Sequence, residues 1–197
     1  MKIARPVLDP SAVYRLWQTP FAAYKLAPRL ASTALQRVRR VLDVGCVPGA
    51  NTHLFAHAGY LGIEVNPNYV AYAQRKSRRP FVVADVTAYE VALDARFDFI
   101  LLNNFLHHIE TPTVRRVLAH LRTLLSPDGH IHIFLPARRS IAVLLAWLDR
   151  GDYPLPLDAW HPLLAEHFDL VVFEPYALKA LGVPLRSMVC CKGRATS

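Results

Sequence analysis

The sequence predicts an α/β fold, a doubly wound, mostly parallel seven-stranded sheet with helices on both faces and an antiparallel final strand. Between residues 41 and 135, short apolar runs alternate with helical segments, a pattern typical of a parallel sheet covered by helices. Right-handed crossovers follow from that alternation. The last two apolar runs are joined only by residues 177–184, which is too short for a crossover helix, so we expect them to pair antiparallel.

The first part of the predicted sheet is bounded by clear turn signals. Strands are expected at 41–44, 60–65, 80–84, 97–102 and 130–135, helices at 51–58, 66–78 and 111–125, and a short helix or loop at 87–94. Gly59 ends the first helix. Asn66-Pro67 and Thr111-Pro112 begin the other two, because proline fits the first helical turn. Pro127-Asp128-Gly129 predicts a turn before the fifth strand.

Helical segments are expected on either side of this core. Residues 9–40 predict an amphipathic helical cap, and 139–150 and 157–167 predict two helices after the fifth strand. Strands at 169–176 and 185–192 follow. Residues 1–197 are therefore expected to form one domain with four parts, which are the cap (1–40), a ligand-binding core (41–135), a helical lid (136–168) and a final strand pair (169–193).

The composition suits a globular chain with a large core. Of 197 residues, 53% are hydrophobic and 19% are charged, and the formal net charge is +8. The excess of Lys and Arg would attract nucleic acid, an anionic membrane or an acidic small molecule, but it fits an ordinary basic surface equally well. The three cysteines form no disulfide or zinc pattern, which favours a cytoplasmic location, and no signal sequence or membrane span is predicted.

The run from Val41 to Asn51 (VLDVGCVPGAN) combines a strand, a glycine turn and the start of a helix. Asp43 comes near the carboxyl end of the strand, where open α/β sheets bind ligands, and glycine lets a ligand approach backbone amides at a helix N-terminus. The G-x-G-x-x-G spacing of dinucleotide-binding proteins is absent, and no Gly-Lys-Ser/Thr indicates a phosphate loop. Both of these common ligand classes are therefore disfavoured.

The same run resembles the D-x-G-x-G-x-G motif of class I S-adenosylmethionine-dependent methyltransferases, whose fold is Rossmann-like. Asp43, Gly45 and Gly49 match the motif. Val47 replaces its middle glycine, and a β-branched residue resists positive φ. Four later segments resemble further motifs in the family's order, namely Gly62–Pro67, Ala84–Val86, Phe97–Ile109 and Leu125–Gly129, the last with Asp128 in place of a glycine. The resemblance covers residues 41–135.

The resemblance implies that the chain binds S-adenosyl-L-methionine and releases S-adenosyl-L-homocysteine. Glu64 would accept hydrogen bonds from both ribose hydroxyls, Asp85 would face the adenine amino group, and Asn103 would lie near the methionine part. The full set implied for the cofactor is Asp43, Gly45, Cys46, Val47, Gly49, Glu64, Val65, Asp85, Val86 and Asn103. Other roles stay open, with Asp43 or Asp85 as a cap of the following turn and Glu64 as a solvated strand end.

Candidate catalytic residues follow the fourth strand. His107 and His108 are candidates for a general base, since a histidine near its ordinary pKa can remove a proton from a hydroxyl or an amine. Packing near the cofactor is the alternative role. His130 and His132 share one strand face but have no recognisable third ligand, so no metal site is predicted.

The expected acceptor is a small apolar or aromatic molecule, with O-methylation favoured over N or C. Helix 139–150 is strongly apolar, and Tyr14, Trp17, Phe21, Tyr24, Tyr153 and Trp160 are candidates for lining a pocket, although a core role fits them as well. One alternative is a nucleic-acid methyltransferase that uses the basic run 75–79, which the missing N-P-P-Y-type signature at 102–105 disfavours. Another is a non-catalytic relic of the fold that lies on a membrane surface through 139–150. The sequence predicts no oligomeric state.

Overall fold

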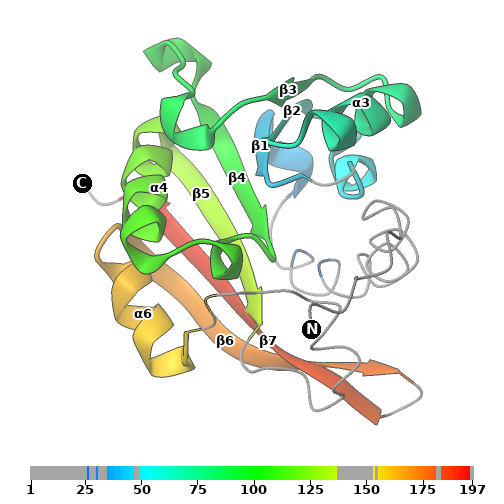
Figure 1. The fold of residues 1–197 in the computed structure, drawn as a ribbon. Coiled ribbons are helices and arrows are strands. Elements are labelled where there is room, and N and C mark those ends of the chain that lie inside the picture. Colours follow the sequence, from blue (N-terminus) through cyan, green and yellow to red (C-terminus); the bar gives the residue numbers. More distant parts are fainter. Residues whose placement is uncertain are drawn as a thin grey trace, which may run out of the picture.

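The computed structural model describes residues 26, 30, 35–46, 49–136, 153, 155–180 and 183–195 of the chain, with the backbone alone at 178–180 and 183–186. Its seven-stranded sheet has the order β3-β2-β1-β4-β5-β7-β6 (Figure 1). β7 runs antiparallel to both of its neighbours, and the other neighbouring strands pair in parallel. The predicted fold class is confirmed.

The strands lie where the apolar runs predict them, with changes mainly at their ends. They are β1 (Arg40–Val44), β2 (Gly59–Glu64), β3 (Phe81–Val83), β4 (Phe97–Asn103), β5 (Leu125–Pro136), β6 (Phe168–Ala180) and β7 (Val183–Ala195). Four of the five residues of β1 are buried, as expected for a strand that has neighbours on both sides and helices on both faces.

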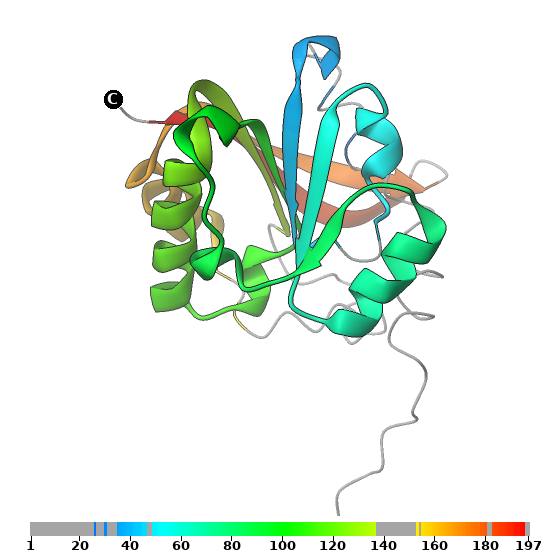
Figure 2. The same ribbon diagram turned by 90° about the horizontal axis from the view of Figure 1, so that it is seen from above.

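Helices cover both faces of the sheet, and Figure 2 shows the strands between α3 and α4. One face carries α4 (Thr111–Leu124), α6 (Leu157–Ala165) and the 3₁₀ turn η3 (Val86–Ala88), and the other carries η2 (Thr52–Phe55) and α3 (Pro67–Lys76). Three further 3₁₀ turns are η1 (Leu35–Arg37), η4 (Leu93–Ala95) and η5 (Leu106–His108). The two clusters of buried side chains that result are called here the α4-face core and the α3-face core.

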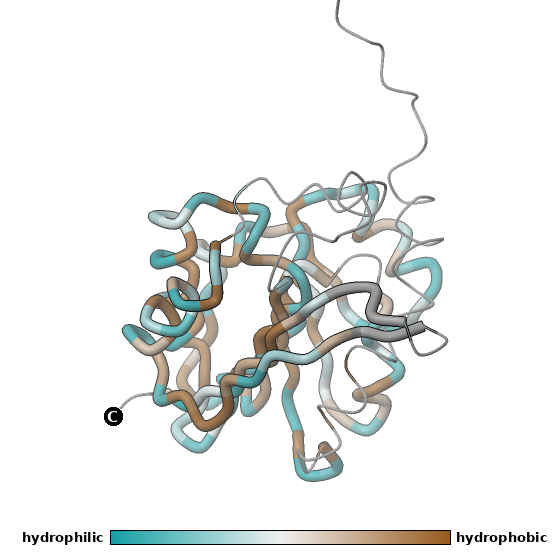
Figure 3. The backbone as a smooth tube through the Cα atoms, turned by 90° about the horizontal axis from the view of Figure 1, so that it is seen from below, coloured by the Kyte–Doolittle hydropathy of each residue, from teal (hydrophilic) through white to brown (hydrophobic). Residues whose placement is uncertain are grey.

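The two long helices of the described chain form for the reasons that the sequence suggests. In α4 the buried side chains recur every three or four residues, at Val114, Val117, Leu118, Leu121 and Leu124. In α3 the Asn66 side chain accepts a hydrogen bond from the backbone N–H of Asn68, and Pro67 occupies the first turn. Figure 3 shows that apolar residues are concentrated along the central strands, with polar residues on the outer turns of the helices.

The helix predicted at 51–58 is wrong in type and length, because only the 3₁₀ turn η2 forms there. The guanidinium group of Arg79 donates hydrogen bonds to the carbonyl oxygens of Phe55, Ala56 and Ala58. These carbonyls are therefore satisfied by a side chain rather than by a longer helix.

The turn predicted at 127–129 lies inside β5 as a local irregularity. Phe97 pairs with Leu125 while Phe99 pairs with His130, so the intervening residues of β5 bulge out of the ladder. The bulge is tight, since a Cβ added to Gly129 would lie 2.8 Å from Cδ1 of Leu125.

The last two strands pair antiparallel, as predicted, and are longer than the sequence suggests. Cys190 and Cys191 in β7 point to opposite faces, with Cys190 in the α3-face core and Cys191 in the α4-face core. Like Cys46, they are buried, and none of the three cysteines forms a disulfide bond.

Most of the predicted cap at 9–40 and all of the predicted lid helix at 139–150 fall outside the described residues. Within the cap, Leu26 and Leu30 are buried in the α3-face core. The predicted role of 139–150 at a membrane surface therefore stays a prediction. No helix in the described part of the chain is long and apolar enough to cross a membrane.

Candidate functional site

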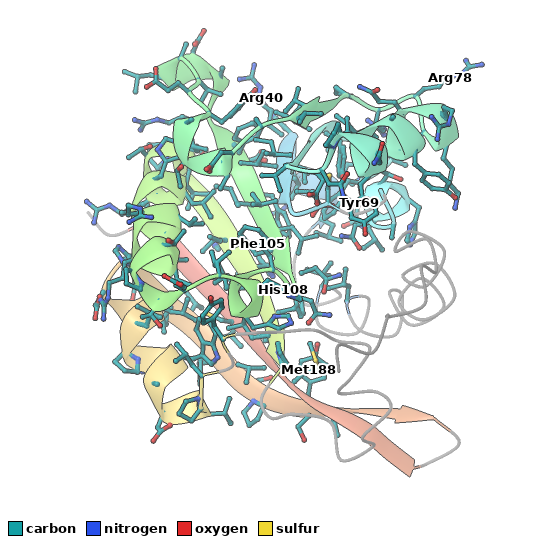
Figure 4. The ribbon with its side chains drawn as sticks, in the orientation of Figure 1. Arg40, Tyr69, Arg78, Phe105, His108 and Met188 are labelled. Atoms are coloured by element: carbon teal, nitrogen blue, oxygen red, sulfur yellow. The ribbon has the colours of Figure 1, made fainter. Side chains whose placement is uncertain are left out.

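The carboxyl ends of β1, β2 and β4 meet at one edge of the sheet, where the strand order reverses between β1 and β4. Open α/β sheets bind ligands at such a point. Asp43, Glu64 and Asn103 are at or next to the last residues of these strands. Figure 4 shows His108 near this end of the sheet and Arg40 and Arg78 near the other. We call this edge, with the glycine turn that follows β1, the carboxyl edge.

Asp43 is fully buried at this edge. Its Oδ2 accepts hydrogen bonds from the Tyr60 hydroxyl at 2.7 Å and from Nδ2 of Asn51 at 3.1 Å. Its Oδ1 has no hydrogen-bond partner among the described residues. Burial raises the pKa of Asp43 to about 6, and the two hydrogen bonds oppose that rise. Side chains supply both of these donors, so these contacts differ from those of a residue that caps a turn through backbone N–H groups.

The glycine turn after β1 has the geometry expected of its glycines, because Gly45 has φ +67° and Gly49 has φ +78°. Its amides are less open to a ligand than the sequence suggests. The N–H groups of Gly45 and Cys46 donate to the carbonyl oxygen of Ile63, and that of Gly49 donates to Cys46. The thiol of Cys46 is buried, and burial raises its pKa strongly, so it is an inert packing group. Val47 lies outside the described residues.

Substitution of Gly45 by alanine is expected to lower the free energy of unfolding by about 2–4 kcal/mol. The new Cβ would have to adopt positive φ and would lie 2.7 Å from Cδ2 of Phe105. Urea unfolding followed by circular dichroism measures the change. Gly59→Ala is the matched control, because among the described residues its Cβ would meet one atom, the carbonyl oxygen of Arg39 at 3.3 Å, and a loss below about 1 kcal/mol is expected. Equal losses in the two variants would contradict this account of the turn.

Glu64 ends β2 and is 8% exposed, which is inconsistent with its alternative role as a solvated strand end. Its Oε1 accepts a hydrogen bond from the backbone N–H of Asn66 at 2.9 Å. Burial raises the pKa of Glu64, and hydrogen bonds from the backbone at Asn66 and Val65 partly offset this. Val65 follows it and is 65% exposed, so an apolar side chain lies open to a ligand beside a carboxylate.

Asp85 caps the short turn η3, as one of its two predicted roles requires. Its Oδ1 accepts hydrogen bonds from the backbone N–H and the hydroxyl of Thr87, and these bonds lower its pKa. Both bonds use one oxygen, which leaves Oδ2 for a ligand. Val86 is buried in the α4-face core, so only its backbone can reach a ligand.

Asn103 is the last residue of β4 and Asn104 follows it, and both have a buried side-chain Oδ1 without a partner in the described structure. Asn103 is the predicted site residue. Asn104 has φ +56°, a left-handed conformation that asparagine tolerates better than most residues, and its N–H donates to Phe134 at 2.9 Å. This sharp turn directs Phe105 against Gly45. The sequence carries no signal for positive φ at Asn104, so only the folded chain reveals this turn.

The two candidate catalytic histidines differ in exposure. His107 is buried and 1% exposed, and its carbonyl oxygen accepts a hydrogen bond from Tyr153. His108 is exposed, and the two rings lie 4.0 Å apart. The Tyr153 hydroxyl also donates to Glu110, so the segment that precedes α6 is attached to the loop after β4. Of the two histidines, only His108 can meet an acceptor without rearrangement.

Among the described residues, no group of three or more His, Cys, Asp or Glu side chains could hold a metal ion. His130 accepts a hydrogen bond from Arg194 at 3.1 Å. His132 is buried and stacks on Phe99 with ring centroids 4.7 Å apart, and burial lowers its pKa to about 3. It is therefore a neutral core residue at physiological pH.

The chemistry of the carboxyl edge suits S-adenosylmethionine. This cofactor carries hydrogen-bond donors, which are its ammonium group, ribose hydroxyls and adenine amino group. The edge carries acceptors, and the oxygens Oδ1 of Asp43, Asn51, Asn103 and Asn104 are buried with no partner in the ranges described. Buried acceptors without a donor are costly, and a ligand rich in donors would satisfy them. Tyr60 and Asn51, the two donors to Asp43, are not predicted from the sequence, because Tyr60 precedes the second motif and Asn51 follows the last glycine of the first.

Comparison with known proteins agrees with this geometry. Residues 41–129 match the family model of the methyltransferase domain. Trans-aconitate 2-methyltransferase of Escherichia fergusonii is 31% identical over 166 residues, which cover 74% of this chain and 64% of that protein. An uncharacterized protein of Synechococcus is 35% identical over 133 residues, 58% of this chain and 31% of its own length. The chain thus spans less than two thirds of these relatives.

The fold is shared with solved structures. The N-methyltransferase NodS of Bradyrhizobium japonicum, crystallised with S-adenosyl-L-homocysteine, superposes with a TM-score of 0.65 at 20% identity over 96% of this chain and 91% of that one. The matched domain, the strand order and the ordered series of motifs lead to one family. Residues 41–129 therefore match the methyltransferase domain family, and the fold and motifs support a class I S-adenosylmethionine-dependent methyltransferase.

Proposed function

We propose that this chain transfers the methyl group of S-adenosylmethionine to a small apolar or aromatic molecule, and that an oxygen atom is the favoured acceptor. One observation carries the proposal, namely the line of acidic and amide side chains along the carboxyl ends of β1, β2 and β4. These side chains are buried or half-buried, and several of their oxygens have no partner in the described part of the protein. Ligand binding is the physical reason for such an arrangement.

Each residue of the carboxyl edge has a proposed part in holding the cofactor. Glu64 accepts hydrogen bonds from the two ribose hydroxyls. Its carboxylate has acceptor positions to spare, because the N–H of Asn66 occupies only one of them. Asp85 accepts one from the adenine amino group through Oδ2, and the exposed side chain of Val65 packs on the adenine ring. Asn103 faces the methionine part. Bound here, the cofactor supplies a methyl group on a sulfonium cation, which is already strongly electrophilic.

His108 is the proposed general base. Transfer to a hydroxyl requires loss of a proton, and an exposed imidazole at the carboxyl edge can accept it. His107 is buried, and its carbonyl oxygen accepts a hydrogen bond from the N–H of Tyr153. Its proposed role is to hold the loop that carries His108. Holding the acceptor oxygen in line with the methyl group supplies most of the rate enhancement in such a transfer.

The acceptor site is proposed on the side of the loop that follows β4. Tyr153 is 42% exposed and bonds to this loop, so it is available to contact an acceptor. Trp160, by contrast, is 1% exposed in the α4-face core and has the core role. The other aromatic candidates lie outside the described residues. The name of the E. fergusonii relative supports a small-molecule acceptor.

The position of the basic run 75–79 argues against a nucleic-acid substrate. It begins in the last turn of α3 and leads to the amino end of β3, and Figure 4 shows Arg78 far from His108. Arg79 is occupied with the carbonyl oxygens that follow η2. A polyanion bound by this run would therefore meet the opposite end of the sheet from the proposed site.

Methyl transfer itself is the test. With S-adenosylmethionine labelled in its methyl group, the protein is expected to label members of a panel of phenols and carboxylates in preference to amines. Bulk RNA at moderate salt is the comparison substrate and is expected to stay unlabelled. Labelling of RNA alone would contradict the proposal, and labelling of amines alone would replace oxygen by nitrogen as acceptor.

A further inference from the structure

The burial of Asp43 costs free energy that packing alone does not explain. Its side chain is fully buried, and its two polar partners, Tyr60 and Asn51, are 3% and 4% exposed. Burying a carboxylate is costly, and an apolar side chain of similar volume would fill the same space at lower cost. The charge of Asp43 at the end of β1 is therefore expected to have a use.

Tyr60 reaches Asp43 from the neighbouring strand. It pairs with Val41 in the β1–β2 ladder, two positions before the pair formed by Asp43 and Gly62. Its ring packs in the α3-face core, with centroids 5.7 Å from Phe81 and 6.4 Å from Phe55. These contacts hold the ring, so the hydroxyl is presented at 2.7 Å from Oδ2 of Asp43.

We propose that Tyr60 is a positioning residue for cofactor binding, whose hydroxyl keeps the Asp43 side chain in place as a carboxylate, so that the carboxyl edge offers a buried negative charge to a cationic cofactor. The inference rests on the proposed cofactor site. Because both donors bond to Oδ2, the other oxygen stays available as an acceptor. S-adenosylmethionine carries two positive groups and one negative group, so this charge would favour its binding.

The groups around Asp43 determine how much its ionisation depends on the Tyr60 hydroxyl. The titratable and charged groups that act on Asp43 and Tyr60 from the described elements are Glu64 at the end of β2, Cys46 in the turn and Arg79 after α3. Burial, with a smaller contribution from the charge of Glu64, raises the pKa of Asp43 to about 6, and the Tyr60 hydroxyl is the strongest of the contacts that lower it. Removal of the Tyr60 hydroxyl is therefore expected to raise the pKa of Asp43 further, toward physiological pH.

The experiment measures the affinity for S-adenosylmethionine by calorimetry between pH 5.5 and pH 8 in the full chain. In the wild type, affinity is expected to rise with pH as Asp43 ionises, with a midpoint near pH 6 and a plateau above about pH 7. In Tyr60→Phe the midpoint of this curve is expected to shift by about one unit to higher pH, because the free energy of one hydrogen bond corresponds to a pKa change of about that size. The variant would then bind about threefold more weakly at pH 6.5 and nearly as well as the wild type at pH 8.

Three further variants make the result specific. Tyr89→Phe removes a hydroxyl from a partly buried tyrosine at the α4-face core and is expected to follow the wild-type curve. Asp43→Asn is expected to bind weakly with a flatter dependence on pH. Asn51→Ala removes the second donor and is expected to shift the curve in the same direction as Tyr60→Phe, which preserves the test if that variant folds poorly.

The outcomes are separable. A Tyr60→Phe curve that is lower at every pH but has an unmoved midpoint would overturn the inference, because that is the result of lost packing alone. A wild-type chain that binds no S-adenosylmethionine at any pH would instead overturn the proposed function. A shifted midpoint together with an unshifted Tyr89→Phe curve supports the proposed role of Tyr60.

Discussion

Replacing Glu64 with glutamine is expected to weaken the binding of S-adenosylmethionine by about 10- to 100-fold. The carboxylate is the proposed acceptor for both ribose hydroxyls, and hydrogen bonds to a charged acceptor are stronger than those to a neutral amide. An amide also presents a donor to one of the hydroxyls. Glutamine keeps the size of the side chain, so the loss reports on the chemistry at the end of β2 rather than on a cavity. Calorimetric titration measures it.

The matched control for this prediction is Glu90→Gln. Glu90 is exposed and lies away from the strand ends, so its replacement is expected to leave the cofactor affinity within twofold of the wild type. Circular dichroism spectra of both variants verify the fold. If Glu64→Gln bound the cofactor as tightly as Glu90→Gln does, the ribose would have to lie elsewhere.

Replacing His108 with alanine is expected to lower kcat by about 100-fold while the affinity for the cofactor stays nearly unchanged. The exposed imidazole is the proposed base that takes the proton from the acceptor hydroxyl, and no contact with the cofactor is proposed for it. Steady-state rates with the best acceptor found in the panel, together with calorimetry, separate the two quantities.

His53→Ala provides the comparison for this substitution. His53 is also exposed, and it lies in η2 with its Nδ1 2.9 Å from the carbonyl oxygen of Ala50. Its replacement is expected to change kcat by less than threefold. If His108→Ala retained full activity, the acceptor would be deprotonated without it, and proximity alone would account for the rate.

The fold class and most element boundaries are predictable from the sequence because their causes are local. Asn66-Pro67 begins α3 through a side-chain cap and a fixed φ, and the spacing of apolar residues in α4 defines one buried face. The connection at 177–184 is too short for a crossover, which fixes the direction of β7. Glu64 and Asp43 are identified by their place at the ends of strands.

Features that depend on contacts between distant residues are not predictable in the same way. The helix expected at 51–58 is reduced to one turn because Arg79, more than twenty positions later, bonds to its last carbonyl oxygens. The link from Tyr60 to Asp43 needs the register of β1 with β2. Asn104 takes its left-handed conformation in the turn after β4, and only the folded chain shows which of the two histidines is buried.

The central claim is that the cofactor lies across the carboxyl ends of β1, β2 and β4. A crystal structure of the chain grown with S-adenosyl-L-homocysteine tests it most directly. The account predicts density for the ligand at that edge, with both ribose hydroxyls within about 3 Å of the Glu64 carboxylate. Density at another place on the protein, or a ribose without contact to Glu64, would contradict it.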